Sequence, residues 1–317
     1  MSTTRRAGMI VLQLVLLAAV LVFASRQLYA QWTDVRALWA TTQVQWLWIV
    51  VASGIVLATY ALLIHSWRML LAGWGGSLSF PSAARIWTIA NLGRYLPGKV
   101  WSIGALGALA GREGVSPIAA GGAAILGTML NIGSGFAVLA VASASVLNVF
   151  APWLRSVTLV LSALFVIGTV MFPVVLPPLL GRMARWRGYN VPVQQLPART
   201  LWASTSMNII SWMCYGAAFA AFARGISPHV VASVPLFVVI WTASYLSGYL
   251  ALFAPGGIGV REVAIGGGLV GLGLAAAPDA TLLALASRVW LTALELAPGL
   301  LALLWSSARR RRTSSHA

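Results

Sequence analysis

Charged side chains are scarce in this sequence, and acidic ones are the scarcest. Of 317 residues, 8% are charged and five are Asp or Glu, whereas a soluble domain carries about 25% charged residues. Hydrophobic residues make up 60% of the chain. This composition excludes a soluble enzyme or binding domain, because a surface that faces water needs more charge. It predicts a protein whose solvent is lipid, folded as one integral membrane domain over residues 1–317.

Cysteine and histidine are also rare. The lone Cys214 excludes an internal disulfide, and the three histidines are scattered along the chain. We therefore expect no metal site and no cofactor. With so few acids there is no Asp-rich motif and no evident acid–base pair for modifying a lipid, so we expect that the chain is not an enzyme.

Basic residues account for most of the charge, with 21 Lys and Arg and a formal net charge of +16. They lie mainly at the ends of apolar segments. At such positions they set the orientation of a membrane protein and meet anionic head groups. Because no basic stripe interleaved with aromatic residues is present, we expect no nucleic-acid partner.

Six apolar segments reach the length of about 20 residues that a membrane-spanning helix needs. The first follows Arg5 and Arg6 and resembles a signal peptide, but we expect a retained anchor because no small-x-small cleavage site follows it. Twelve basic residues fall on one side of the six spans and four on the other. Because the more basic side faces the cytoplasm, we expect both termini there, in a protein of the bacterial inner membrane. Residues 306–317 then form a basic cytoplasmic tail. The predicted spans are residues 9–25, 46–66, 118–147, 157–180, 200–222 and 280–305.

Two further apolar stretches are interrupted by Pro-Gly. In residues 79–117, the runs 86–96 and 100–111 are each about 15–20 Å long as helices, too short for a hydrocarbon core of about 30 Å. We therefore expect a re-entrant hairpin that enters and leaves on the cytoplasmic side. In residues 228–278, both runs are long enough to cross, so that stretch is either re-entrant or fully spanning.

The two interrupted stretches resemble each other at a constant offset of 154. Eight of 18 positions agree between residues 79–96 and 233–250, and Ile-Trp-Thr occurs in both. Each copy then reaches Pro-Gly and later an Arg-Glu pair, Arg112-Glu113 in a predicted cytoplasmic loop and Arg261-Glu262 directly after the second break. The alternative to duplication is chance similarity between two Trp-rich runs.

The predicted orientation turns one copy over relative to the other, so we expect inverted repeats over residues 46–147 and 200–305. The predicted fold class is an all-α polytopic membrane helix bundle with two interrupted, re-entrant helical hairpins related by this repeat. Transporters of this kind bind substrate at the repeat interface. A helix that begins inside the membrane presents free N–H groups and the positive end of its dipole, which bind phosphate or carboxylate.

Cationic residues flank both breaks. Arg94 and Lys99, the only lysine of the chain, bracket the first break at Pro97-Gly98. We interpret them as contacts to a lipid phosphate; the alternative is that both side chains reach to the nearest interface. Arg261 and Glu262 follow the second break, where they either bind a head group or cap the helix and pair locally. That break is Pro255-Gly256-Gly257.

The last predicted span carries Arg288, Thr292 and Glu295 on one helix face near mid-membrane. A charge there costs about 3 kcal/mol against lipid, so we expect both charges to face the protein interior. Arg261 is the expected partner of Glu295, and Glu262 that of Arg288. The group is either part of a transport site or a structural network. Two asparagines within spans, Asn131 and Asn208, are expected to hydrogen-bond between helices.

Residues 94–101 (Arg-Tyr-Leu-Pro-Gly-Lys-Val-Trp) and 254–262 (Ala-Pro-Gly-Gly-Ile-Gly-Val-Arg-Glu) resemble the two signatures of a known family. It is the transmembrane region of lysylphosphatidylglycerol synthase and its stand-alone, flippase-like relatives, and the resemblance covers residues 10–305. It implies outward movement of an aminoacylated phosphatidylglycerol in the synthase, and links relatives to isoprenoid, dolichol-lipid or hopanoid pathways. It also implies roles for Arg94, Lys99, Arg261 and Glu262.

The function predicted from all of this is translocation of an anionic phospholipid or polyprenyl-linked lipid. The soluble aminoacyl-transferase domain of the synthase does not follow the membrane region in this sequence, so we expect translocation without lipid synthesis. The alternative is a non-catalytic accessory subunit that presents lipid to a lipid-synthesising partner enzyme. The expected ligand is in both cases a membrane lipid with an anionic head group.

Overall fold

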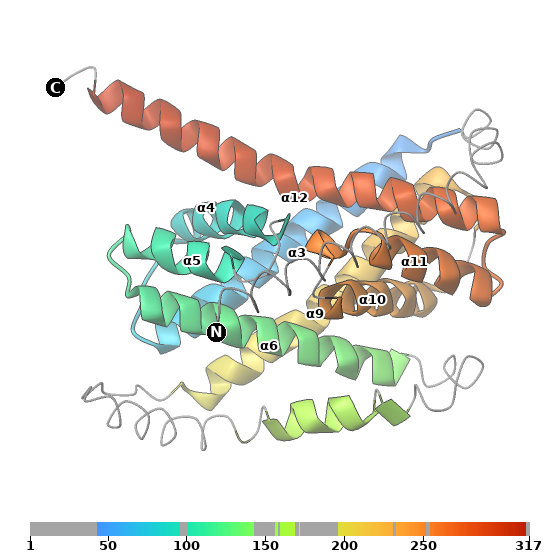
Figure 1. The fold of residues 1–317 in the computed structure, drawn as a ribbon, viewed down its shortest axis with the longest axis horizontal. Helices are drawn as coiled ribbons and strands as arrows, with labels where there is room; N and C mark the ends of the chain where they lie inside the picture. Colours follow the sequence, from blue (N-terminus) through green and yellow to red (C-terminus); the bar gives the residue numbers. More distant parts are fainter. Residues whose placement is uncertain are drawn as a thin grey trace, which may run out of the picture. The chain divides into compact units, whose positions relative to one another are not determined.

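The computed structural model describes residues 43–95, 101–142, 156–157, 159–168, 171, 196–230, 233–251 and 254–314. All regular structure in these residues is helical, as predicted (Figure 1). The elements are α3 (Trp46–Gly73), α4 (Phe80–Asn91), the 3-10 helix η1 (Leu92–Tyr95), α5 (Trp101–Gly111), α6 (Pro117–Ala142), α9 (Ala198–Ile226), α10 (Val234–Leu250), the 3-10 helix η2 (Pro255–Gly257), α11 (Val260–Gly271) and α12 (Ala277–Ser314).

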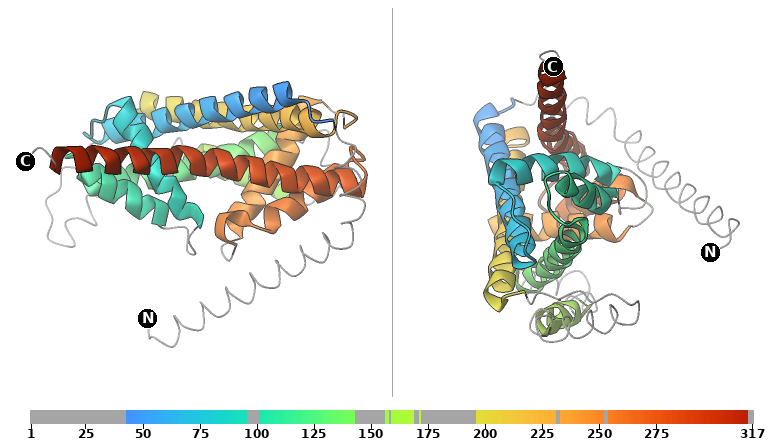
Figure 2. Two further views of the ribbon diagram at one scale, coloured as in Figure 1. Left: turned by 90° about the horizontal axis from the view of Figure 1, so that it is seen from above. Right: turned by 90° about the vertical axis from the view of Figure 1, so that its left-hand side faces the viewer.

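Within the described residues, four helices are long and apolar enough to cross a membrane, namely α3, α6, α9 and residues Ala277–Ala302 of α12. They confirm four of the six predicted spans. The predicted span 9–25 lies outside the described residues, and 157–180 is described only in part, with an apolar helix over Leu159–Gly168. Helix α12 continues to Ser314 (Figure 2), so the predicted tail begins as part of this helix.

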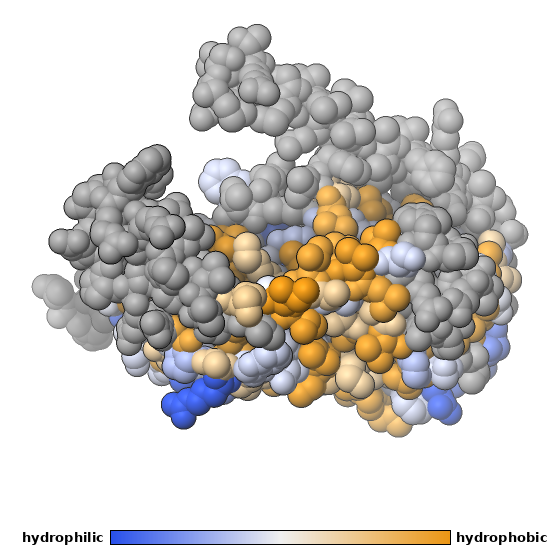
Figure 3. Space-filling view, turned by 90° about the horizontal axis from the view of Figure 1, so that it is seen from below, coloured by the Kyte–Doolittle hydropathy of each residue, from blue (hydrophilic) through white to orange (hydrophobic). Residues whose placement is uncertain are grey.

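Large apolar side chains are freely exposed on these helices. Leu47 of α3 is 72% exposed, Ile118 and Val141 of α6 are 87% and 81% exposed, and hydrophobic residues cover most of the described surface on the face drawn in Figure 3. Apolar patches of this extent are rare on soluble monomers and fit a lipid environment. The burial pattern therefore agrees with the composition in making this a multi-pass membrane protein.

The helices follow the same order in each half of the chain. A long helix, a short helix, a Pro-Gly break, a short helix and a long helix occur as α3, α4, α5 and α6, with 28, 12, 11 and 26 residues. They occur again as α9, α10, α11 and the spanning part of α12, with 29, 17, 12 and 26 residues. Both α4 and α10 begin one residue after the matched serines Ser79 and Ser233.

The same turn also joins the last two helices of each half. After α5, the N–H groups of Gly114 and Val115 donate to Gly111 and Ala110, and Gly114 has a φ of 80°. After α11, Gly273 and Leu274 donate to Val270 and Leu269, and Gly273 has a φ of 65°. Both are Schellman caps, which need glycine because of the positive φ.

A tyrosine–tryptophan contact recurs as well. The tryptophan of the first Ile-Trp-Thr, Trp87, packs on Tyr60 of α3 with ring centroids 5.6 Å apart. The second, Trp241, stacks on Tyr215 of α9 at 6.3 Å. The shared tripeptide therefore marks the face by which each short helix packs on the preceding long helix.

One expectation for the interrupted stretches needs correction. The apolar runs of residues 228–278, predicted to be long enough to cross, form helices of only 17 and 12 residues, because the Schellman glycine ends α11 early. The two Arg-Glu pairs occupy different places, as predicted, one in a loop and one at a helix start. Arg112-Glu113 lies in the turn after α5, where Arg85 pairs with Glu113, whereas Arg261-Glu262 lies in the first turn of α11.

The described residues belong to two compact units. Unit 1 is drawn from Met1–Leu57, Asn91–Ser102 and Cys214–Ala317, and unit 2 from Ala58–Ala90 and Ile103–Met213. Unit 2 contains a core in which apolar residues of α3, α4, α5 and α6 pack together, including Leu70, Ile86 and Leu126. Unit 1 contains both breaks in the helices.

Unit 2 also holds a buried polar cluster. The side chain of Asn208 on α9 accepts from Asn131 of α6 at 3.0 Å and donates to Ser66 of α3 at 3.3 Å, and Asn208 is 2% exposed. Trp212 donates to the carbonyl of Asn131 at 2.9 Å. The interhelical hydrogen bonds predicted for the two asparagines are confirmed.

Replacing Asn208 with alanine should therefore lower the free energy of unfolding in detergent by about 1–2 kcal/mol, since it leaves buried partners without their hydrogen bonds. The matched control is Ser206→Ala on the same helix, where an exposed hydroxyl donates to its own helix at Trp202. The control should change stability by less than about 0.5 kcal/mol. Equal effects of the two substitutions, measured by denaturant titration, would contradict this account of the polar cluster.

Candidate functional site

Most of the predicted site residues come together in unit 1. Arg94 lies in η1, Gly256 and Gly257 lie in η2, and Arg261 and Glu262 lie in the first turn of α11. Pro255 is the first residue of η2. Pro97, Gly98 and Lys99 lie outside the described residues. The charged residues of α12 are the remaining members.

The helix end before the first break lies against the second break. The 3-10 helix η1, which precedes the first break, contacts η2, which forms the second break, and it also contacts α12. Residues about 160 positions apart in the sequence thus form one region, which we call the break cluster: η1, η2, the first turn of α11 and the α12 face with Arg288 and Glu295.

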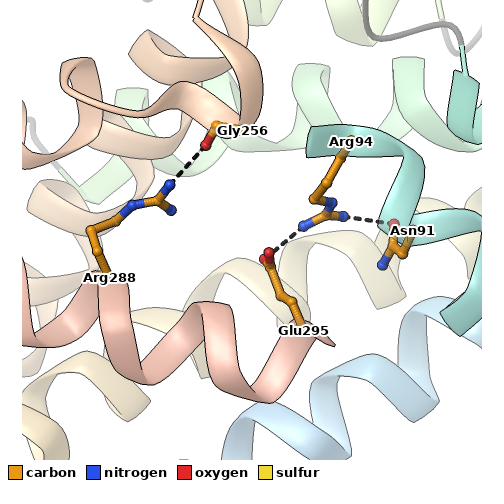
Figure 4. Close-up of polar contacts among 5 residues, drawn as sticks. All are labelled: Asn91, Arg94, Gly256, Arg288 and Glu295. Atoms are coloured by element: carbon orange, nitrogen blue, oxygen red, sulfur yellow. Dashed lines mark hydrogen bonds and ion pairs between the residues drawn. The ribbon is translucent and has the colours of Figure 1, made fainter. Parts of the chain in front are cut away.

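The α12 face of the break cluster is buried, as predicted. Arg288 and Glu295 are each 8% exposed, and Thr292 between them is half-buried. The two charges are seven residues apart and therefore point the same way, into the region where the breaks meet (Figure 4). Helix α12 thereby presents one cation and one anion to the two breaks.

Arg288 holds the second break. Its Nε donates to Glu262 Oε1 at 2.6 Å, and its Nη2 donates to the carbonyl oxygen of Gly256 at 3.0 Å (Figure 4 draws the second bond). The predicted pairing of Arg288 with Glu262 is confirmed. One guanidinium therefore ties α12 both to η2 and to the first turn of α11.

Glu295 binds η1, the helix end before the first break. Arg94 Nη1 donates to Glu295 Oε1 at 2.6 Å, and Arg94 Nη2 donates to Asn91 Oδ1 at 2.8 Å (Figure 4). Sequence reasoning assigned Glu295 to Arg261, and the structure gives it Arg94 instead. It also missed Asn91, although the i, i+3 spacing of Asn91 and Arg94 at the end of a helix is a usable signal.

Arg261 is enclosed by α10. It is 4% exposed, and its guanidinium carbon lies 5.3 Å from the ring centre of Trp241 and 4.5 Å from that of Tyr245. Aromatic faces attract a guanidinium electrostatically. Sequence reasoning missed these two partners, although Trp241, Tyr245 and Gly248 share one helix face at i, i+4 and i+7.

Two glycines make the slot for this side chain. A Cβ on Gly248 would lie 2.4 Å from Arg261 Cγ, and a Cβ on Gly257 would lie 2.9 Å from Arg261 Cδ. Gly257 has a φ of 72°, and Gly259, the N-cap of α11, has a φ of 84°. Glycine is thus required at the second break both for backbone conformation and for room.

The start of α11 has no side-chain cap. No side chain caps this helix at Gly259, and its first intrahelical hydrogen bond runs from Val263 N–H to Gly259. The N–H groups of the residues before Val263 therefore point out of the helix, at the positive end of its dipole. The arginine beside them adds a full positive charge.

Several buried polar atoms in this region have no hydrogen-bond partner among the residues that the structure describes. They are Trp241 Nε1, Thr242 Oγ1, Arg261 Nε, Arg261 Nη2 and Glu262 Oε2. Leaving a buried donor or acceptor unpaired costs about 1–3 kcal/mol each, and more for a charged group. A cluster of unpaired buried polar atoms is typical of a ligand-binding site, where the bound ligand supplies the missing hydrogen-bond partners.

The described charges of the break cluster do not balance. Three arginines (Arg94, Arg261 and Arg288) face two glutamates (Glu262 and Glu295), which leaves one positive charge. Excess charge in a poorly hydrated region is costly unless a counter-ion neutralises it. The break cluster is therefore suited to bind one negatively charged group.

The amino-acid sequence matches the model of one known protein family. The sequence model described as "Lysylphosphatidylglycerol synthase TM region" matches residues 10–299, which include both signatures and every residue of the break cluster. No curated protein matches the chain.

The close packing of Arg261 against Gly248 predicts how a methyl group added at Gly248 changes the stability of the protein. Gly248→Ala should lower the free energy of unfolding by about 1–3 kcal/mol, because the new Cβ overlaps the Arg261 side chain. Gly266→Ala on α11 is the matched control, since a Cβ there meets nothing within 4 Å, and alanine should stabilise the helix by up to about 1 kcal/mol. Thermal unfolding in detergent separates the two, and a Gly248→Ala protein as stable as the control would disprove the slot.

Proposed function

The chain belongs to the family of the lysylphosphatidylglycerol synthase TM region, and we propose that it moves an anionic lipid between the two leaflets of a membrane. The candidate substrates are a phospholipid or a polyprenyl-linked lipid. Translocation breaks no covalent bond, and the proposal assigns the chain no catalytic step.

The observation that carries the proposal is the excess positive charge of the break cluster. Arg94, Arg261 and Arg288 are offset by two carboxylates, and the uncapped start of α11 adds a partial positive charge. A lipid phosphate supplies the missing negative charge and oxygen acceptors for the unpaired N–H groups of Arg261. The head group binds there while its acyl chains remain in lipid.

The arrangement of the chain supports transport over static binding. We propose that the two halves are inverted repeats with re-entrant hairpins and that both termini are cytoplasmic, in a bacterial inner membrane. The recurring helix order, the recurring Schellman turns and the recurring tyrosine–tryptophan contacts support duplication. In proteins built from inverted repeats, the two halves exchange conformations and open a central site to either side.

The test is transport by the purified full chain in phosphatidylglycerol-containing vesicles, with a fluorescent phosphatidylglycerol reduced by dithionite from outside. The wild type should accelerate loss of the protected inner-leaflet signal. Arg261→Gln should slow this rate by about 10-fold or more, because charged hydrogen bonds to phosphate are lost. Arg85→Gln is the matched control, because Arg85 pairs with Glu113 in unit 2, outside the break cluster. This variant should transport lipid at the rate of the wild type.

Failure of the wild type to accelerate exchange of phosphatidylglycerol, and of a labelled polyprenyl phosphate in the same assay, would refute the proposal. Lipid binding by the same preparation without any exchange would favour an accessory subunit that presents lipid to a partner enzyme.

A further inference from the structure

The unpaired atoms at the start of α11 are of two opposite kinds. Arg261 leaves Nε and Nη2 unpaired, and an arginine can only donate hydrogen bonds. Glu262, the next residue, leaves Oε2 unpaired, and an ionised carboxylate can only accept them. A phosphate satisfies the first residue but cannot satisfy the second.

The two oxygens of Glu262 differ in their surroundings. Oε1 accepts from Arg288 Nε at 2.6 Å, whereas Oε2 is buried and has no hydrogen-bond partner within the described part of the chain. The side chain as a whole is 15% exposed. The bond to Arg288 therefore explains why a carboxylate is held at this place, but it leaves one oxygen in need of a donor.

The unpaired donors of Arg261 and the unpaired acceptor of Glu262 lie at the same helix start. Arg261 and Glu262 belong to the first turn of α11, beside the outward-pointing N–H groups of that turn. A group that binds there meets donors from Arg261 and the backbone, and one acceptor from Glu262. The ligand must therefore combine an anionic oxygen with a nearby N–H or O–H.

We propose that Glu262 selects head groups that carry a hydrogen-bond donor, a hydroxyl or an ammonium group, a few atoms from the phosphate. The inference rests on the proposed function and narrows its phospholipid substrates to anionic phosphodiesters with such a donor; zwitterionic lipids serve below only as binding probes for the donor. Arg261 binds the phosphate, and Glu262 Oε2 accepts from the donor. Simple phosphodiesters that end in an alkyl group bind more weakly.

Head-group entry requires movement in the break cluster. The unpaired atoms of Arg261 and Glu262 are shielded in this conformation. Because the Arg94–Glu295 pair holds η1 against α12, its separation is one way to admit the head group.

The test is native mass spectrometry of the purified full chain with lipids of identical acyl chains, compared in two pairs. Phosphatidylglycerol and phosphatidylmethanol have the same charge, but only the first has head-group hydroxyls. Phosphatidylethanolamine and phosphatidylcholine are both zwitterions, but only the first has N–H donors. The donor lipid should bind about 2- to 10-fold better in the first pair, and about 10-fold or more in the second, where the hydrogen bond joins two charges.

Glu262→Gln tests the assignment to one residue. Glutamine keeps an oxygen for Arg288 and places an amide N–H where Oε2 was, so the preference for phosphatidylethanolamine over phosphatidylcholine should fall to about one. The preference for phosphatidylglycerol should fall less, because a hydroxyl also accepts hydrogen bonds. Glu113→Gln is the matched control, since Glu113 pairs with Arg85 in unit 2, and it should retain both preferences.

The outcomes separate the two proposals. Binding of all four lipids without preference for donors, or preferences that survive Glu262→Gln unchanged, would overturn the role of Glu262 and leave lipid binding intact. Failure of the wild type to bind any of the four lipids would instead contradict a phospholipid as the substrate in the proposed function. Unchanged phosphatidylmethanol binding by Glu262→Gln shows that the variant is folded.

Discussion

The cost of keeping guanidinium groups away from water shapes the region where the two breaks meet. Arg94 and Arg288 are each held by a carboxylate at 2.6 Å and by a second oxygen, whereas Arg261 is enclosed by two aromatic rings and two glycines. Breaking a buried pair such as Arg288–Glu262 costs about 3–5 kcal/mol. Helix α12 carries one residue of each ion pair, Arg288 and Glu295, on one face, so this helix ties η1 to η2 and α11.

The two halves of the chain contribute to this region unequally. At the sequence offset of 154 at which the two interrupted stretches resemble each other, Arg94 of the first stretch lies opposite Gly248 of the second. The glycine leaves room for Arg261, which comes from the helix after the break instead of the helix before it. The first half therefore supplies one arginine to this region and the second half supplies two, Arg261 and Arg288, and the carboxylates come only from the second half. An asymmetric pair of halves around one net positive charge suits a single anionic ligand.

Much of the fold follows from the sequence, and so does part of the site. Length and hydropathy predicted the four long helices, and the cost of charge in lipid predicted that Arg288 and Glu295 face inward. The pairing of Arg288 with Glu262 was predictable because both belong to neighbouring elements joined by one turn. The pairing of Glu295 with Arg94 was not, since it depends on the contact between η1 and α12, across 201 positions. The enclosure of Arg261 depends on Gly248, which matters because it has no side chain. A role of this kind is hard to recognise in a sequence.

The central claim is that a lipid phosphate binds between the leaflets, where the two breaks meet. Single-particle cryo-electron microscopy of the full chain in lipid nanodiscs of phosphatidylglycerol tests this most directly. The account predicts density for a phosphate within hydrogen-bond distance of Arg261 and the first N–H groups of α11, with η1 and η2 inside the hydrocarbon layer. Head-group density confined to the two membrane surfaces, with η1 and η2 lying in water, would contradict it.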